Sequence, residues 1–183
     1  MSLVLRAAAP ADAGAMAAIY APYVTDTAIT FELDPPDADA FAGRIATVTR
    51  DFPWLVAERD GAVIGYAYAS RYRERAAYRW VCETGIYLAR DATGRGVGGR
   101  LYEALLDALE AWSYVAAIGV ITLPNRPSVR LHERLGFEHV GTQPRIGYKN
   151  GEWRDVGFWQ IDLAPRRKSP PEPARPAVPD QPR

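Results

Sequence analysis

Two hairpin signals set among alternating strand and helix patterns restrict the fold of this chain more than any other feature. Asp60-Gly61 and Asn150-Gly151 each join two runs rich in β-branched and aromatic residues. Both dipeptides favour the two-residue turns of antiparallel hairpins. The segment between them alternates strand patterns with helix patterns, which predicts crossovers instead. A chain that combines hairpins with crossovers is expected to form an α/β domain, with a mixed sheet covered by helices.

About seven strands and four helices are expected. Strand patterns cover residues 3–7, 54–58, 63–69, 80–88, 115–123, 137–148 and 152–163. Helix patterns cover residues 10–23, 37–50, 98–112 and 127–136. Pro10 suits the first turn of a helix, Leu101 and Leu105 keep helical spacing, and Gly136 suits the position just after a helix.

Length and composition narrow the functional classes. The 183 residues fit one domain, and the balance of 22 basic and 22 acidic side chains argues against a nucleic-acid binder. One cysteine and two histidines leave too few ligands for a zinc module, so no metal is expected. The N-terminus lacks a signal-peptide pattern, and no run reaches about 18 apolar residues. We therefore expect a cytoplasmic protein that does not bind a membrane.

The last twenty residues differ in composition from the rest. They hold seven of the fifteen prolines and no aromatic residue. Such a segment cannot bury enough apolar surface to offset the entropy of ordering it. We therefore predict a folded domain over residues 1–163 and a disordered Pro/Arg-rich tail over residues 164–183. The tail carries a net charge of +3, so the domain carries −3.

A glycine-rich loop over residues 93–99 lies between a predicted strand and an amphipathic helix. Glycines at such a turn let backbone N–H groups approach an anion, and the helix dipole adds to the attraction. The loop also fits the dinucleotide pattern G-x-G-x-x-G, but no acidic residue lies between Glu110 and Glu133, where that fold needs one. No Gly-Lys-Ser/Thr follows, which excludes a Walker loop. A phosphate-binding loop is favoured over an ordinary flexible loop.

The order of elements, this loop with Gly96-Val97-Gly98, and the segment LPNRPSVRLHERLGF at residues 123–137 resemble the GNAT superfamily of N-acetyltransferases. Three further stretches resemble its phosphinothricin and methionine sulfoximine N-acetyltransferase branch: FPWLVAE at 52–58, YRWVCETGIY at 78–87 and GEWRDVGFW at 151–159. The resemblance covers about residues 3–163 and implies the GNAT fold, with acetyl-CoA as co-substrate. It departs from the superfamily at Thr93, where Gln or Arg is usual, and Arg95 is close enough to substitute.

Glu83 is the candidate general base. It lies in a strand of apolar and small residues, where burial would raise the pKa of a carboxylate. From the residues alone, a solvent-facing or Arg-paired glutamate is equally possible. The resemblance favours catalysis, because the family places its catalytic Glu here. Neighbouring Cys82 is expected on the opposite face of the strand, as a packing residue.

His132 occupies a helix position where many relatives carry a tyrosine that protonates the departing thiolate, and where the phosphinothricin branch commonly has histidine. A histidine can donate a proton near neutral pH, or it can be a core residue satisfied by a backbone carbonyl. Both interpretations stay open.

The resemblance also implies the residues that hold acetyl-CoA. The backbone of Ile86, Tyr87 and Leu88 would pair with the pantetheine arm and supply oxyanion donors. The pyrophosphate would lie on Gly94, Arg95, Gly96, Val97, Gly98 and Gly99. Asn125 and Ser128 could contact the pantetheine or a phosphate, although both residue types also cap helices.

Four arginines between residues 71 and 79 form the strongest local charge. Arginine binds carboxylates and phosphinates as a planar fork. In the family, positions matching Arg73, Arg75 and Tyr78 contact an amino-acid-like substrate, and Phe31 matches an aromatic at the pocket wall. A core phenylalanine is the alternative for Phe31.

We therefore expect an acetyl-CoA-dependent N-acetyltransferase that acts by direct transfer in a ternary complex. Its expected acceptor is the α-amino group of a small substrate such as phosphinothricin, methionine sulfoximine or methionine sulfone. The alternatives are an N-acetyltransferase for another small amine or a peptide N-terminus, and a non-catalytic acyl-CoA sensor. The resemblance also implies a homodimer.

Overall fold

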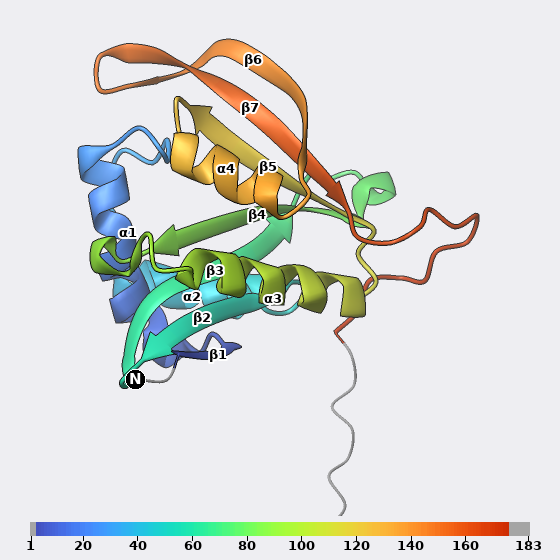
Figure 1. Ribbon diagram of the computed structural model, residues 1–183. Helices are drawn as coiled ribbons and strands as arrows, with labels where there is room; N and C mark the ends of the chain where they lie inside the picture. The colour runs from blue at the N-terminus through green and yellow to red at the C-terminus, as the bar shows by residue number, and fades with distance from the viewer. Residues whose placement is uncertain (1–2, 176–183) are drawn as a thin grey trace, which may run out of the picture.

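The computed structural model describes residues 3–175 (Figure 1). Seven strands form one mixed sheet in the order β1-β2-β3-β4-β5-β7-β6, together with four α-helices. The α/β prediction with seven strands and four helices is confirmed. The strands are β1 Leu3–Ala7, β2 Trp54–Arg59, β3 Ala62–Arg71, β4 Val81–Leu88, β5 Ala116–Leu123, β6 Glu138–Lys149 and β7 Glu152–Asp162. The helices are α1 Ala13–Asp26, α2 Ala38–Val48, α3 Val97–Ala111 and α4 Arg126–Arg134, with short 3-10 helices η1 Pro10–Asp12, η2 Ala76–Tyr78 and η3 Arg90–Ala92.

Both predicted hairpins form, β2–β3 and β6–β7. Asp60 and Gly61 have φ angles of 51° and 81°, and Asn150 and Gly151 have 54° and 78°. Positive φ at both central residues is what the right-handed twist of the flanking strands requires of a two-residue turn. One helix boundary differs from expectation. The segment that begins at Pro10 first forms η1, and α1 then continues past Pro22 to Asp26, beyond the expected end at residue 23. Val24, in this extra turn, is buried.

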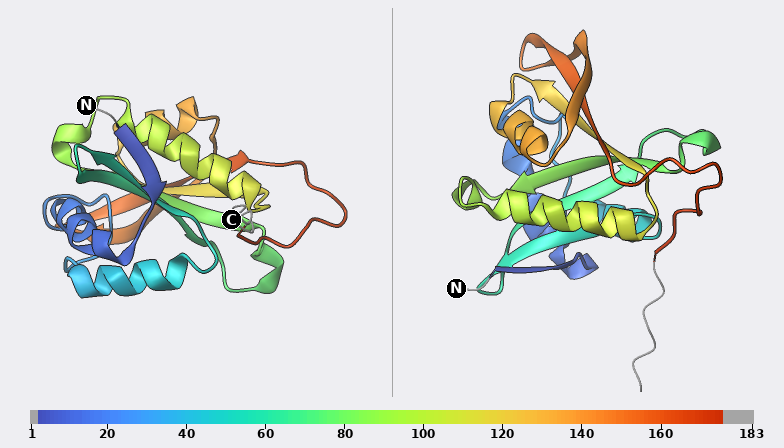
Figure 2. Two further views of the ribbon diagram at one scale, coloured as in Figure 1. Left: turned by 90° about the horizontal axis from the view of Figure 1, so that it is seen from below. Right: turned by 45° about the vertical axis from the view of Figure 1, so that its right-hand side comes forward.

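Helices cover both faces of the sheet (Figure 2). On one face, Leu101, Leu105 and Leu109 of α3 form a core with residues that include Cys82 of β4. On the other face, α1 and α2 bury a second core that contains Phe41 and Ile45, with Tyr87 of β4 packed against it. Cys82 is therefore a packing residue on the α3 face, as predicted. By strand alternation, Glu83 faces the α1–α2 side.

One strand pair differs from the others. β4 and β5 run parallel, whereas every other neighbouring pair is antiparallel. The parallel pairing covers only Val81–Thr84 of β4 against 116–119 of β5. Beyond that point the two strands diverge, and their ends lie far apart in Figure 1. We call this divergence of β4 from β5, beyond Thr84 and Gly119, the fork. The loop before α3 lies at its open end (Figure 1).

The described part of the C-terminal segment runs back over the domain. The indole Nε1 of Trp80 donates to the carbonyl of Pro171 at 2.8 Å, and the backbone N–H of Ala174 donates to Trp112 at 3.0 Å. The proposed division at residue 163 stays a prediction, and residues 176–183 of the predicted tail lie outside the described residues. Within residues 3–175, no helix is both long and apolar enough to cross a membrane.

Candidate active site

The fork between β4 and β5 leaves backbone polar groups of β4 facing an open gap. The N–H of Ala89 donates to Ile64 of β3, whereas the carbonyl of Trp80 accepts from Val115 on the β5 side. Because backbone groups alternate along a strand, those of Ile86 and Leu88 face β5, and those of Tyr87 face β3. The hydroxyl of Tyr23 donates to the Leu88 carbonyl at 2.7 Å. The backbone groups of Ile86, three residues after Glu83, therefore face the open gap.

The glycine-rich loop has a backbone conformation that glycine favours, and it leads into the N-terminus of α3. Gly94 and Gly96 have φ angles of 72° and 77°, which side chains rarely adopt, and Gly96 precedes the first residue of α3. The first N–H groups of a helix have no partner inside it. A Cβ at Gly98 would lie 3.2 Å from Cδ1 of Leu88, a tight contact where the helix meets β4. The hydroxyl of Thr93 donates to the carbonyl of Arg90 at 2.8 Å, so it is held within the loop.

Glu83 is half-buried on β4, opposite Ser70 of β3 and Ile118 of β5. Burial raises the pKa of its carboxyl group above the ordinary value, and the positive charge of Arg73 opposes part of that rise. Among the residues that the structure describes, no hydrogen bond or ion pair involves its carboxylate. A half-buried carboxylate without a partner is suited to accept a proton.

His132 is buried on α4, with 3% of its surface exposed. Its Nδ1 lies 2.8 Å from the carbonyl oxygen of Ser128, and its Nε2 lies 2.9 Å from the hydroxyl of Tyr102. A carbonyl can only accept, so Nδ1 carries a proton, and in a neutral ring Nε2 would then accept from Tyr102. Burial lowers the pKa of His132, and the bond to Ser128 opposes that effect. The geometry is that of a neutral core histidine, one of the two interpretations left open above.

Tyr102 extends this network to β4. Its hydroxyl lies 2.6 Å from Oγ1 of Thr84, which in turn lies 3.2 Å from the carbonyl of Ile118 on β5. Thr84 is the last residue of β4 that pairs with β5. The polar chain therefore joins α4, α3, β4 and β5 at the point where the fork begins.

Asn125 caps α4. Its Oδ1 accepts from the backbone N–H of Ser128 at 3.3 Å. The capping alternative is therefore confirmed for Asn125, whereas the hydroxyl of Ser128 lies 3.4 Å from Nδ1 of His132. A role of either residue in ligand binding stays a prediction.

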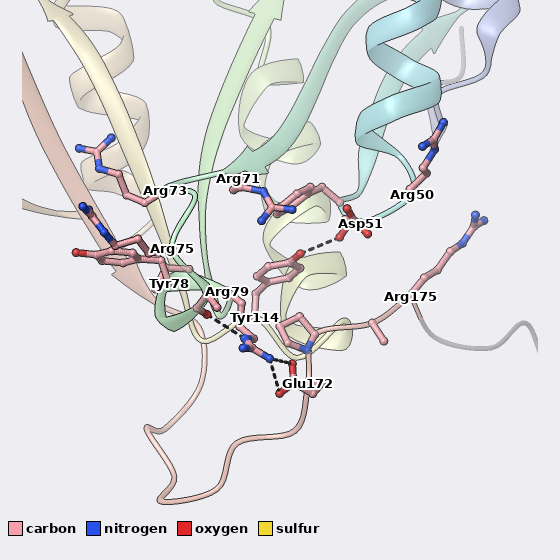
Figure 3. Close-up of a pocket in the computed structure, with 15 residues that line it drawn as sticks. Arg50, Asp51, Arg71, Arg73, Arg75, Tyr78, Arg79, Tyr114, Glu172 and Arg175 are labelled. Atoms are coloured by element: carbon pink, nitrogen blue, oxygen red, sulfur yellow. Dashed lines mark hydrogen bonds and ion pairs between the residues drawn. The ribbon is translucent and has the colours of Figure 1, made fainter.

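The predicted substrate residues fall into two places. Arg73, Arg75 and Tyr78 line a pocket of about 350 Å³ that the segment from Glu172 to Arg175 closes on one side. Figure 3 shows these three side chains on one side of the pocket, with Asp51 and Arg50 on the other. Glu83 does not line this pocket. Phe31 lies apart from it, on the loop between α1 and α2, with its ring against Gly147 of β6.

A family described as "Acetyltransferase (GNAT) domain" matches residues 5–157 of the chain. The chain belongs to this GNAT acetyltransferase family. As its relatives are, it is an enzyme of the N-acetyltransferase class. The resemblance found in the sequence is confirmed.

Individual relatives show which GNAT acetyltransferases this chain is similar to. It is 40% identical to phosphinothricin N-acetyltransferase of Streptomyces viridochromogenes over 174 residues, 95% of this chain and 94% of that protein. It is 35% identical to the L-methionine sulfoximine/L-methionine sulfone acetyltransferase of Pseudomonas paraeruginosa, over 93% of this chain and all of that protein. The crystal structure of a phosphinothricin acetyltransferase from Sinorhizobium meliloti, in complex with acetyl-CoA, matches with a TM-score of 0.88 and 37% identity, covering 98% and 97% of the two chains.

Several residues around the site of this GNAT acetyltransferase are not indicated by any sequence pattern described above. A Cβ at Gly99 would lie 2.6 Å from Nη2 of Arg134, so this α4 guanidinium lies over the N-terminus of α3. Tyr102 and Thr84 form the network around His132. Only Tyr102 had a local signal, a polar hydroxyl on the apolar face of α3. In the described part of the chain, no three potential metal-ligand side chains gather.

Proposed function

We propose that this protein transfers the acetyl group of acetyl-CoA to the α-amino group of a small amino-acid-like acceptor of the phosphinothricin, methionine sulfoximine or methionine sulfone type. The observation that carries the proposal is the fork at Glu83. A carboxylate that is half-buried and has no hydrogen-bond or ion-pair partner among residues 3–175 is followed, three residues on, by backbone groups that face the gap beside β4 and lead to a glycine-rich helix start. The relatives with these named activities match over nearly the whole chain.

The residues along the fork fit acetyl-CoA. The open edge at Ile86 can accept the pantetheine arm as an added strand would. Gly94 to Gly99, with Arg95 and Arg134, would hold the pyrophosphate at the start of α3. Side chains at the two positive-φ glycines would strain the loop, and one at Gly99 would displace the Arg134 guanidinium. When bound, acetyl-CoA supplies an activated thioester.

Glu83 then has one task, to take a proton from the acceptor's ammonium so that the nitrogen lone pair is free. An ordinary glutamate is a weak base at neutral pH. Because burial raises the pKa of Glu83, its basicity moves towards the working pH. The N–H of Ile86 lies on the open edge, where it can donate to an oxygen that gains negative charge. Holding both substrates at the fork supports direct transfer in a ternary complex.

Arg73, Arg75 and Tyr78 would bind the acceptor's anionic groups, because a planar guanidinium can donate two parallel hydrogen bonds to a carboxylate or a phosphinate. Arg73 is near enough to Glu83 to affect its pKa, which links the arginine pocket to the fork. Phe31 would form an apolar wall.

We assign His132 a positioning role within this site. Burial lowers the pKa of His132 and so favours the neutral ring, in which Nδ1 holds the proton against Ser128 and Nε2 has none to give to the leaving thiolate. The neutral ring keeps α4, Tyr102 and β5 together at the fork.

The proposal includes a cytoplasmic homodimer. Val140, Ile146 and Trp153 are exposed apolar side chains on the β6–β7 hairpin, and β6 is an edge strand. Exposed apolar patches of this kind mark contact surfaces. Light scattering after size exclusion will give the mass in solution, and a monomer at micromolar concentration would refute the dimer.

The decisive experiment is a thiol-release assay with acetyl-CoA against phosphinothricin, methionine sulfoximine, methionine sulfone and common amino acids. We expect turnover with the first three, and a fall in kcat of about 10²–10⁴ in Glu83→Gln. Glu103→Gln, at an exposed position on α3, is the matched control. Binding of coenzyme A without turnover on any acceptor would instead favour the sensor. Faster turnover of another amine or a peptide would reassign the acceptor.

A further inference from the structure

Lys149, the last residue of β6, is buried with 4% of its surface exposed. Its ammonium donates to three backbone carbonyls, at 2.7 Å to Val24, 2.8 Å to Thr30 and 2.7 Å to Glu32. An ammonium has three N–H donors, so these carbonyls use all of them. Two carbonyls belong to the loop after α1, and the third lies in the last turn of α1.

Burying a charged amine is unfavourable unless its donors are satisfied. Burial lowers the pKa of Lys149, and the nearby carboxylate of Glu32 opposes that effect. Val24 contributes one of the last carbonyls of α1, which have no partner within the helix. A hydrophobic side chain would leave all three carbonyls unsatisfied. The lysine therefore acts as a clamp on the backbone of residues 24–32.

The clamped loop carries Phe31. The Phe31 ring lies on Gly147, where a Cβ would come within 2.0 Å of Cζ, and Gly147 is two residues before Lys149 on the same strand. One short stretch of β6 therefore holds both the backbone of the loop and its aromatic ring. Phe31 keeps 39% of its surface exposed, so the ring is presented to a ligand as well as packed.

The loop also connects to the face of the sheet that carries Glu83. The hydroxyl of Tyr20 lies 2.6 Å from Oγ1 of Thr30, and the Tyr20 ring meets the Tyr87 ring edge-on, with centroids 4.7 Å apart. Tyr87 and Glu83 lie on the same face of β4, because they are four residues apart on a strand. The position of the loop is thus coupled by direct contacts to the side of the sheet where the acceptor amine would meet Glu83.

We propose that Lys149 is a positioning residue that fixes the Phe31 loop and so shapes the acceptor side of the active site without contacting acetyl-CoA. This inference rests on the proposed function, in which Phe31 forms a wall for the acceptor. It predicts a selective defect, in which acceptor binding is lost and acetyl-CoA binding is kept.

The first test is kinetic. Lys149→Met keeps the length of the side chain and removes its charge and donors. We expect KM for the acceptor to rise about tenfold or more, and KM for acetyl-CoA to change less than about twofold. Lys168→Met is the control, because Lys168 is the chain's only other lysine and is exposed. An unchanged acceptor KM, or equal rises in both KM values, would overturn the proposal.

A double-mutant cycle tests whether Lys149 acts on acceptor binding through Phe31 or through a general loss of stability. If Lys149 acts through the Phe31 loop, Phe31→Ala should cost much less in the Lys149→Met background than in the wild type. Strictly additive effects on kcat/KM would contradict the coupling. Lys149→Arg serves if the Met variant does not fold. It keeps the charge, but its donors are fixed in one plane, unlike the three rotatable donors of an ammonium, so we expect a milder form of the same selective defect.

Hydrogen exchange tests the clamp independently of any activity. Amides of residues 27–33 should exchange at least about tenfold faster in Lys149→Met, while those of β3 and β4 keep their protection. If no acceptor is turned over, the proposed function fails, but hydrogen exchange at residues 27–33 still tests whether Lys149 holds the loop. Unchanged exchange at residues 27–33 refutes it in either case.

Discussion

The imidazole of His132 lies directly against the backbone of Gly119, where a Cβ would come within 2.5 Å of both Cδ2 and Nε2. Gly119 is the last residue of β5 that pairs with β4. The histidine therefore packs at the point where the two strands separate, and it can do so only because position 119 has no side chain. Its other contacts, to Ser128 and Tyr102, hold the ring in that place.

Gly119→Ala is expected to lower the free energy of unfolding by about 1–3 kcal/mol, the usual cost of overpacking a core. Gly43→Ala is the matched control. Gly43 is exposed within α2 with nothing within 4 Å of an added Cβ, so alanine there should stabilise by about 0.5–1 kcal/mol. Urea denaturation of both variants measures the difference. Equal stability of Gly119→Ala and wild type would contradict the contact.

Stability should depend on pH through His132. Burial lowers the pKa of His132 in the folded state, whereas the unfolded value is about 6.5. As the pH falls below 6.5, the unfolded chain binds a proton that the folded chain does not, so the free energy of unfolding decreases. The decrease continues down to the folded pKa of His132.

His132→Gln should therefore flatten the dependence of stability on pH below about 6.5, although it destabilises the protein at neutral pH. His139→Gln, at the exposed histidine on β6, is the control substitution. Chemical denaturation at a series of pH values provides the comparison. A kcat that collapses in His132→Gln while stability is unaffected would restore the general-acid interpretation.

The pH–rate profile should report Glu83 and its neighbour Arg73. Burial raises the pKa of Glu83, so kcat/KM should rise with pH through a value above the ordinary 4.3 or so for glutamate. Removing the opposing charge in Arg73→Gln should move this acidic limb to higher pH. Arg59→Gln, on β2, is the control. An acidic limb at the same pH in Arg73→Gln and wild type would show that the limb is not that of Glu83.

Deleting residues 164–183 should leave the acetyltransferase domain folded and active. The deletion removes three hydrogen bonds, Trp80 to Pro171, Ala174 to Trp112 and Ala164 to Val115, and the exposed ion pairs of Arg79 with Glu172 and of Arg166 with Asp162. Exposed ion pairs contribute about 0–1 kcal/mol and neutral hydrogen bonds about 1 kcal/mol, so the loss should be about 3–5 kcal/mol. Thermal unfolding and kcat/KM of the shortened chain measure it. An insoluble or unfolded product would move the domain boundary beyond residue 163.

The parts that could be predicted from the sequence depend on residues close together in the chain. Asp60-Gly61 and Asn150-Gly151 make hairpins because their own backbone preferences match the turn. The glycines before α3 and the apolar spacing within α3 are also local. Glu83 could be singled out because its strand neighbours are apolar, which predicts partial burial.

Lys149 and His132 show why the rest could not be predicted. The carbonyls that bind Lys149 lie 117 to 125 residues away in the chain, and no spacing rule connects them. The partner of Nε2 in His132 lies 30 residues away on another helix. The short pairing of β4 with β5 has no signature either, because both strands continue for four more residues past the fork.

The sequence by itself thus determined the α/β class, the order of elements, the glycine-rich loop and the candidate base, because each follows from short-range conformational preference and burial. Only the tertiary structure decided where β4 leaves β5, that His132 bridges α4 and α3, and that Lys149 bonds to the backbone on both sides of Phe31. Those features depend on which distant polar groups meet away from water, where each donor needs a specific acceptor, and only the packed chain brings them together.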